Sequence, residues 1–257
     1  MNAPAPSENP TIVTAAMLVI GDEILSGRTK DKNIGFVADY LTNLGIDLKE
    51  VRIVADEHED IIEAVNALRH RYTYVFTSGG IGPTHDDITA EAVSQAFGVP
   101  CTHHPQAMKD MGAYYAERGM EFTESRKRMA RTPEGAELIE NPISRAPGIR
   151  MANVHIMAGV PKIMQAMMDA IAPTLQGGLK IISKTVDSNH GEGDVGGPLA
   201  HIQAQNPDTM IGSYPRYDDG RYTTQLVIRG RDEAAVETAT KAVEALVAQL
   251  DAAKGNT

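Results

Sequence analysis

The chain has 257 residues, of which 42% are hydrophobic and 23% are charged, as expected for a globular protein with one large domain or two unequal ones. Its net charge of -10 argues against nucleic acid as a partner, because backbone binding needs a basic surface. The single cysteine, Cys101, excludes an internal disulfide framework and favours the cytoplasm. No apolar run is long enough for a membrane span, and residues 1–10 lack the basic start of a secretion signal, so we expect no membrane partner.

The first part of the chain alternates strand and helix patterns. Residues 12–20 form an apolar run typical of a strand buried on both faces of a parallel sheet. Apolar residues at helical spacing follow over 34–44 and 61–68, and strand-like segments lie at 47–54 and 74–77. This β-α-β-α-β order predicts a three-layer α/β sandwich with a mostly parallel sheet, whose ligands bind at the carboxyl ends of the strands.

Further helices are predicted after this region. One runs from Ile88 to about Gly98, and another covers about 106–118. The segment "NVHIMAGVP" reads as a strand and a turn, after which Pro161 suits the first position of a helix.

The pattern changes after the glycines of "QGG" at 176–178. From there the order is β-α-β-β-α, which predicts a small α+β unit with a hairpin turned by Asp-Asp-Gly. We therefore predict a flexible tail over 1–10, an α/β domain over 11–177 and a small domain over 178–257.

The stretch "VFTSGGIGPTHDDIT", residues 75–89, is the strongest candidate for a site. Its glycines allow a ligand to approach the main chain, and the following helix offers free N–H groups, which together suit a phosphate. The stretch lacks both the lysine of a GxxxxGK[ST] loop and the spacing of GxGxxG. Asp86 and Asp87 would repel a phosphate unless a cation lay between them, so the loop predicts a metal and a phosphate together.

The residues of this loop are explained equally well by a purely structural role. Aspartate is a preferred N-cap, so Thr84, Asp86 or Asp87 could simply begin the helix, and glycines are common in turns. His85 is a lone loop histidine, a type that is more often solvated than catalytic.

Two other segments could serve the same site. Glu23, Asp31 and Asn33 follow the first strand and would reach the same sheet edge, although a solvated acidic loop explains them as well. Arg126 and Arg128 could offset a diphosphate by charge-assisted hydrogen bonds, although charge runs are usually solvated helix faces.

Three further patterns are best explained without chemistry. The segment "CTHHP" lacks a second pair of zinc ligands, and "GDVG" at 193–196 matches an RNA-clamping GXXG loop only in its letters. Four methionines at core-like spacing are expected to be packing residues: Met157, Met164, Met167 and Met168.

Four segments in order resemble the motifs of the MoaB/Mog-type molybdopterin-binding fold, in the version at the N-terminus of the competence/damage-inducible protein CinA. They are "GDEILSGRTKDKN", "TSGGIGPTHDDITAEAV", "PEGAELIENPISRAPG" and "MAGVPKIMQAM". The remainder resembles the KH-like module that follows in that family. The chain stops before any nicotinamide-nucleotide deamidase domain, so it resembles the stand-alone form, and it is also similar to the molybdopterin-binding-like region of eukaryotic FAD synthases.

This resemblance implies a homo-oligomeric hydrolase that cleaves ADP-ribose or a related dinucleotide such as FAD into AMP and a second monophosphate. It implies a divalent metal, Mg²⁺, Mn²⁺ or Co²⁺, with K⁺ as a further candidate. Catalytic roles would fall to Asp86, Asp87 and Glu23, and metal binding to Asp86, Asp87 and Asp31. The substrate and its phosphates would contact Gly79, Gly80, Gly82, Thr84, Asn33, Arg126, Arg128, Pro147, Gly148, Gly159 and Pro161.

Two positions depart from the family pattern. His85 replaces the second proline of Gly-Pro-Thr-Pro-Asp-Asp, and Lys32 stands in the middle of Asp-Thr-Asn. These departures leave loop rigidity and substrate choice open. Two other functions also stay open: a molybdopterin-binding or adenylyl-transferring protein of molybdenum-cofactor assembly, and a non-catalytic nucleotide-binding module.

Overall fold

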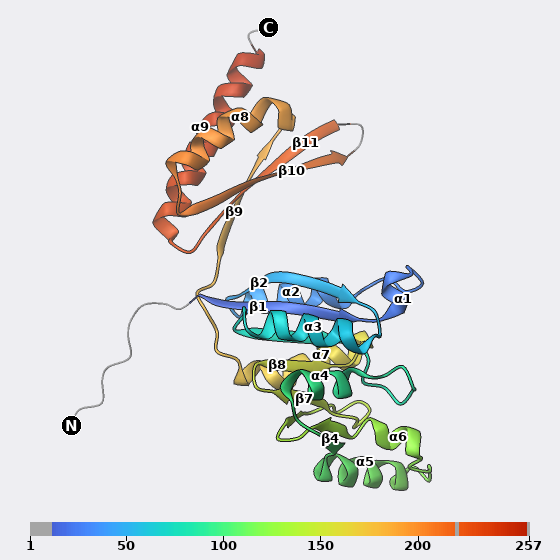
Figure 1. Ribbon diagram of the computed structural model, residues 1–257. Coiled ribbons are helices and arrows are strands. Elements are labelled where there is room, and N and C mark those ends of the chain that lie inside the picture. Colours follow the sequence, from blue (N-terminus) through green and yellow to red (C-terminus); the bar gives the residue numbers. More distant parts are fainter. Residues whose placement is uncertain (1–11, 219–220, 256–257) are drawn as a thin grey trace, which may run out of the picture. The chain divides into compact units, whose positions relative to one another are not determined.

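The computed structural model describes residues 12–218 and 221–255, and the chain divides into two compact units after Gly178 (Figure 1). The predicted tail over 1–10 lies outside the described residues, as do two residues of the predicted Asp-Asp-Gly turn. Among the helices that the structure describes, none combines the length and the apolar character needed to cross a membrane.

The first unit is built on a six-stranded sheet in the order β2-β1-β3-β8-β7-β6 (Figure 1). The first four strands in this order are parallel, and β7 and β6 continue the sheet in antiparallel fashion. This confirms the predicted α/β fold with a mostly parallel sheet. The strands are β1 (Val13–Ile20), β2 (Ile46–Val54), β3 (Tyr74–Ser78), β6 (Glu137–Ile139), β7 (Gly148–Met151) and β8 (Val154–Met157).

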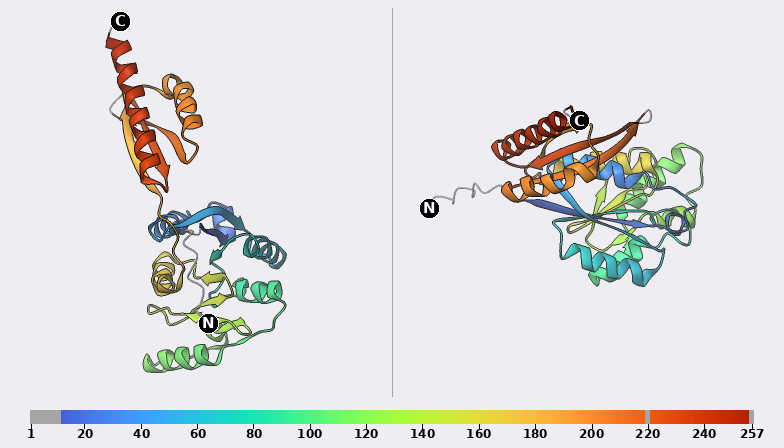
Figure 2. Two further views of the ribbon diagram at one scale, coloured as in Figure 1. Left: turned by 90° about the vertical axis from the view of Figure 1, so that its left-hand side faces the viewer. Right: turned by 90° about the horizontal axis from the view of Figure 1, so that it is seen from above.

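Helices cover both faces of this sheet (Figure 2). Helices α3 (His58–Arg69) and α4 (Thr89–Phe97) pack on one face, and α2 (Asn33–Asn43) and α7 (Pro161–Ile171) on the other. Because alternate residues of β1 enter the two cores, all but one of its residues are buried, as its unbroken apolar run predicts. The four methionines at 157, 164, 167 and 168 are fully buried, which confirms them as packing residues.

Between α4 and β6 the chain forms a smaller group of elements. It contains α5 (Pro105–Glu117), α6 (Glu124–Arg128) and the strand pair β4 (Cys101–His103) and β5 (Arg131–Pro133). Its own core includes Ala107, Met111 and Ala130. The short helix α1 (Asp22–Leu25) follows β1 directly, and a 3₁₀ turn over Ala172–Thr174 follows α7.

The second unit has the predicted β-α-β-β-α order of elements. Its antiparallel sheet has the order β10-β11-β9, and α8 and α9 supply apolar side chains such as Val195 and Val236 to a separate core. The KH-like type is not confirmed, and "GDVG" lies inside a helix rather than in a loop. The elements are β9 (Ile182–Ser188), α8 (Glu192–Gln205), β10 (Thr209–Asp218), β11 (Arg221–Gly230) and α9 (Glu233–Gly255).

Candidate functional site

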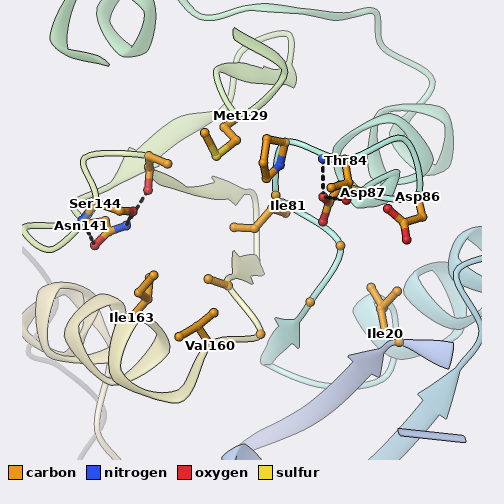
Figure 3. A pocket seen from close by; sticks show the side chains of 18 of the residues that line it. Ile20, Ile81, Thr84, Asp86, Asp87, Met129, Asn141, Ser144, Val160 and Ile163 are labelled. Atoms are coloured by element: carbon orange, nitrogen blue, oxygen red, sulfur yellow. Dashed lines mark hydrogen bonds between the residues drawn. The ribbon is translucent and has the colours of Figure 1, made fainter. Parts of the chain in front are cut away.

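The carboxyl ends of the four parallel strands surround a cavity of about 640 Å³ in the first unit (Figure 3). The lining residues follow the ends of these strands: Gly21 and Glu23 come after β1, Asp56 after β2, residues 79–84 with Asp86 and Asp87 after β3, and residues 158–161 after β8. Parallel strands end at a common edge of the sheet, so the segments that follow them lie close together although they are distant in sequence.

The glycines of the loop after β3 are required by its backbone. Gly79 has φ 111°, and a Cβ on it would lie 2.1 Å from the carbonyl oxygen of Ile20. Gly80 has φ 66°, and its Cβ would lie 2.1 Å from Oγ1 of Thr89. Thr89 donates from its backbone N–H to the Gly80 carbonyl at 3.0 Å and from Oγ1 to the Gly79 carbonyl at 3.1 Å. The loop is therefore pressed against β1 and tied to the start of α4.

The two aspartates of this loop have different surroundings (Figure 3). Asp87 accepts hydrogen bonds from the backbone N–H of Thr84 at 2.8 Å and from its hydroxyl at 2.5 Å. A Cβ on Gly82 would lie 2.5 Å from the same carboxylate, so the third glycine makes room for it. Asp86 is exposed at the rim of the cavity. Helix α4 begins only at Thr89 with no side-chain cap, so neither aspartate is its N-cap.

Asp56 is a cavity residue that the sequence analysis missed. Its Oδ2 accepts from the backbone N–H of Asp22 at 2.9 Å. Burial raises the pKa of Asp56, and the charges of Asp22, Glu23 and Asp86 raise it further against the opposing effect of that hydrogen bond. Asp56 lies two residues after the end of β2. Ligands of such folds bind at the carboxyl ends of the strands, and this expectation, applied to β2, predicts Asp56 as a site residue.

Neither arginine predicted to contact phosphate lines this cavity. Arg126 donates to the Glu121 carbonyl, and its guanidinium lies 4.5 Å from the ring centroid of Tyr115. Arg128 donates to the backbone carbonyl of Asp87 at 3.3 Å, and it lines a separate hollow. Within the described chain, no Lys, Arg or His side chain lines the main cavity.

Asp31 and Asn33 border a smaller cavity of about 230 Å³ rather than the main one. Asp31 Oδ1 accepts from the backbone N–H groups of Asn33 and Ile34, at 3.1 and 2.8 Å, and so caps the first turn of α2. The buried Asn33 donates from Nδ2 to Ser78 Oγ and to the Gly159 carbonyl, both at 2.8 Å. Asn33 therefore ties three loops of the sheet edge together, and its Oδ1 has no partner among the described residues.

The end of the cavity away from the aspartates is mostly apolar (Figure 3). Met129 and Ile163 lie on its walls, together with the polar side chains of Asn141 and Ser144. Asn141 is buried and donates to Ser144 Oγ at 2.6 Å and to the Ala146 carbonyl at 2.7 Å, so it holds the loop that forms this wall. Pro147 lines a different hollow, and Gly148 begins β7.

Nine of the predicted site residues line the main cavity: Glu23, Gly79, Gly80, Gly82, Thr84, Asp86, Asp87, Gly159 and Pro161. The predicted metal ligand Asp31 is not brought into one group with Asp86 and Asp87. In the described ranges, no three His, Cys, Asp or Glu side chains come together as a set of metal ligands. The roles assigned from the sequence stay predictions.

A doubly covered, mostly parallel sheet with an acidic cavity at its carboxyl edge defines an α/β ligand-binding domain. Residues 16–177 match the family described as "probable molybdopterin binding domain", and the chain belongs to this family. Residues 180–254 match the middle domain of FAD synthase.

Individual relatives agree with this assignment. A CinA-like protein of a Sulfurihydrogenibium species is 38% identical over 160 residues, which cover 60% of this chain and 40% of that one. A probable FAD synthase of Caenorhabditis briggsae is 30% identical over 258 residues, or 91% of this chain and 49% of that one. The solved structure of CinA from Thermoplasma acidophilum, described as of unknown function, is 31% identical with a TM-score of 0.59, and the match covers 63% of this chain and 98% of that one. The chain thus spans less than half of either sequence relative.

Proposed function

We propose that the protein hydrolyses the diphosphate bond of a dinucleotide, with a divalent cation, to give AMP and a second monophosphate. One observation carries this proposal: four carboxylates, of Glu23, Asp56, Asp86 and Asp87, line a cavity beside a glycine loop, and no basic side chain of the described chain lines it. A diphosphate placed there would be repelled by these carboxylates in the absence of a cation.

The carboxylates suit Mg²⁺ or a similar ion bound mainly through water and phosphate. Such ions commonly use one or two protein carboxylates and keep several waters, so a closed set of three protein ligands is not needed. Asp86 and Glu23 would hold the ion, since both are exposed at the cavity. A bound cation supplies neutralisation of the diphosphate and a more acidic water.

The other residues of the cavity would position the substrate and move a proton. Asp56 is half-buried and its pKa is raised, so its carboxylate is a better proton acceptor than an ordinary aspartate. The backbone of Gly79–Gly82 allows close approach of the phosphates, and Asp87 keeps this loop in place through Thr84.

The apolar end of the cavity supports a nucleotide as substrate. Ile81, Met129 and Ile163 present an apolar surface suited to a flat heterocyclic ring, and about 640 Å³ is within the range of small-molecule sites. A ring at this end and a diphosphate at the acidic end match the division of ADP-ribose or FAD into polar and apolar parts.

A second candidate is binding or adenylylation of molybdopterin, which the family match to a probable molybdopterin binding domain favours directly. A pterin ring and one phosphate would use the same two ends of the cavity. The two functions differ in their products, because only the hydrolase releases AMP from a dinucleotide.

The deciding experiment follows AMP release from ADP-ribose and FAD with and without Mg²⁺, Mn²⁺ or Co²⁺, alongside binding of molybdopterin. We expect metal-dependent AMP, and we expect Asp86→Asn to lower turnover by about a hundredfold or more. Asp39→Asn, an exposed carboxylate on α2 outside the cavity, is the matched control. Absence of AMP with every metal would refute the hydrolase; molybdopterin binding in that case would support the second function, and nucleotide binding alone a non-catalytic module.

A further inference from the structure

A second hollow of the first unit lies where β4 and β5 meet α6, with a volume of about 550 Å³. We call it the β4–α6 hollow; it shares no lining residue with the main cavity. Arg128, Arg131 and His103 line it, together with the hydroxyl groups of Thr102 and Ser125. The proposed hydrolysis makes no use of this cluster.

The charges of the β4–α6 hollow are not balanced. The carboxylate of Glu91 is shared by two guanidinium groups: it forms an ion pair with Arg131 and lies 3.7 Å from Nη2 of Arg128. The hollow's own carboxylate, Glu124, is already paired with Lys127 at 2.5 Å. One guanidinium charge is therefore left over on a chain whose net charge is -10.

The donors of the hollow are also incompletely used. Arg128 Nε is buried and has no hydrogen-bond partner among the described residues. The guanidinium group of Arg128 is only partly buried as a whole, so an anion in the hollow would be stabilised by its charge and by its accessible N–H groups. Guanidinium groups match phosphate through paired N–H donors, and hydroxyl groups can add further donors.

We propose that the β4–α6 hollow is a binding site for a small phosphate-type anion, either inorganic phosphate or a phosphate monoester. Arg131 and Arg128 are its charged donors, and His103, Thr102 and Ser125 complete it. The site is open to solvent, so affinity in the millimolar range is expected.

An anion in this hollow is coupled to the main cavity through one hydrogen bond. Arg128 Nη2 donates to the backbone carbonyl of Asp87, 3.3 Å away, in the loop that carries both aspartates. Phosphate oxygens would compete with this carbonyl and with Glu91 for the same guanidinium group. Occupancy of the hollow should therefore alter the hydrogen bonding of the loop over 84–88.

The single cysteine of the chain gives a reporter for this hollow alone. Cys101 lines it, is partly exposed and is absent from the main cavity. We expect inorganic phosphate, and in a second arm AMP, to slow modification of Cys101 by a thiol reagent in a saturable way, while sodium chloride of equal ionic strength does not. Protection by only one of the two identifies the anion; protection by neither overturns the proposal.

Variants separate the hollow from the main cavity. Arg131→Gln should raise the phosphate concentration for half-protection by about tenfold, since a charged hydrogen bond is lost. Each variant is compared with itself without phosphate, because burial raises the pKa of the Cys101 thiol and the charge of Arg131 opposes that rise. His103→Gln is a milder second variant, and Arg150→Gln, which removes the partner of Glu137, is the control. Equal protection in Arg131→Gln and wild type would overturn the assignment.

Hydrogen exchange of the loop tests the coupling. Phosphate should change the exchange rates of amides over 84–88 in the wild type and in Arg150→Gln, and much less in Arg131→Gln. An equal change in Arg131→Gln would show that phosphate acts from the main cavity, and the proposed coupling would be wrong. Neither measurement depends on hydrolysis, so their failure is distinguishable from failure of the proposed function.

Discussion

His155 should make the stability of the first unit depend on pH in acid. It lies on β8 with 1% of its surface exposed, and its ring stacks on Phe76 with centroids 5.2 Å apart. Within the described residues neither ring nitrogen forms a hydrogen bond of good geometry, and weak backbone interactions with Asn153 and Val75 only partly favour the charged ring. Burial, aided by the charge of Arg150, lowers the pKa of His155 from 6.5 to about 4.

The size and sign of the effect follow from these two pKa values. Between pH 6.5 and about 4 the unfolded chain binds a proton at His155 and the folded chain does not, so the free energy of unfolding falls as the pH is lowered. The stability that comes from keeping His155 uncharged in the folded protein is fully present above pH 6.5 and is lost by about pH 4. A shift of about 2.5 units corresponds to about 3 kcal/mol.

Urea unfolding of the wild type and of His155→Leu at about pH 7 and about pH 4 measures this directly. Leucine has a similar volume and does not titrate, and other ionisable groups cancel in the comparison. The wild type should lose about 3 kcal/mol more than the variant between the two pH values. His70→Leu, at an exposed histidine after α3, should behave like the wild type. Equal losses in wild type and His155→Leu would refute the reasoning.

Two further substitutions test which residues stabilise the carboxyl edge of the sheet, and a third serves as a control. Gly79→Ala should lower the free energy of unfolding by about 3 kcal/mol or more, because its Cβ would clash with a β1 carbonyl at 2.1 Å and its φ is 111°. Gly35→Ala, in open space on α2, should instead stabilise by about 0.5–1 kcal/mol in the same urea titration, and a similar loss at both glycines would contradict this. Asn33→Ala should lower the free energy of unfolding by about 2–3 kcal/mol, because Ser78 and the Gly159 carbonyl lose their hydrogen-bond donor. An unchanged thermal midpoint would show that these hydrogen bonds do not stabilise the sheet edge.

The central fold could be predicted from the sequence because its signals are strong and local. Residues 12–20 are apolar on both faces, and Gly98, with φ 69°, ends the helix that was expected to stop near it; Gly45, with φ 73°, follows α2 in the same way. The strands β4 and β5 have only three residues each, which is too short to show a two-residue periodicity in the sequence. The helix predicted from Ile88 to about Gly98 is α4, whose N-cap is Ile88 and whose C-cap is Gly98.

The site was predicted less completely because charge alone does not say which surface a side chain faces. Arg128 was expected in the cavity, but it lies behind the loop and contacts the Asp87 carbonyl. Asp31 was expected as a metal ligand; its carboxylate accepts from two backbone N–H groups at the start of α2, and its metal role stays a prediction. In both cases the side chain bonds to backbone groups of the protein itself, locally for Asp31 and across 41 positions of the chain for Arg128.

The acidic loops are also where local preferences conflict with the fold. Asp22, Glu23, Asp56 and Asp86 come from three separate strand ends; burial raises the pKa of Asp56, and the charges of the other three carboxylates raise it further. A protein gains no stability from gathering like charges without a partner, and of these four carboxylates that of Asp56 also has a structural contact, because it accepts from the backbone N–H of Asp22. Asp87 differs, since its carboxylate holds Thr84. The electrostatic cost is carried by side chains that line the cavity and can bind a ligand. This pattern is expected where function, rather than folding, selects the side chain.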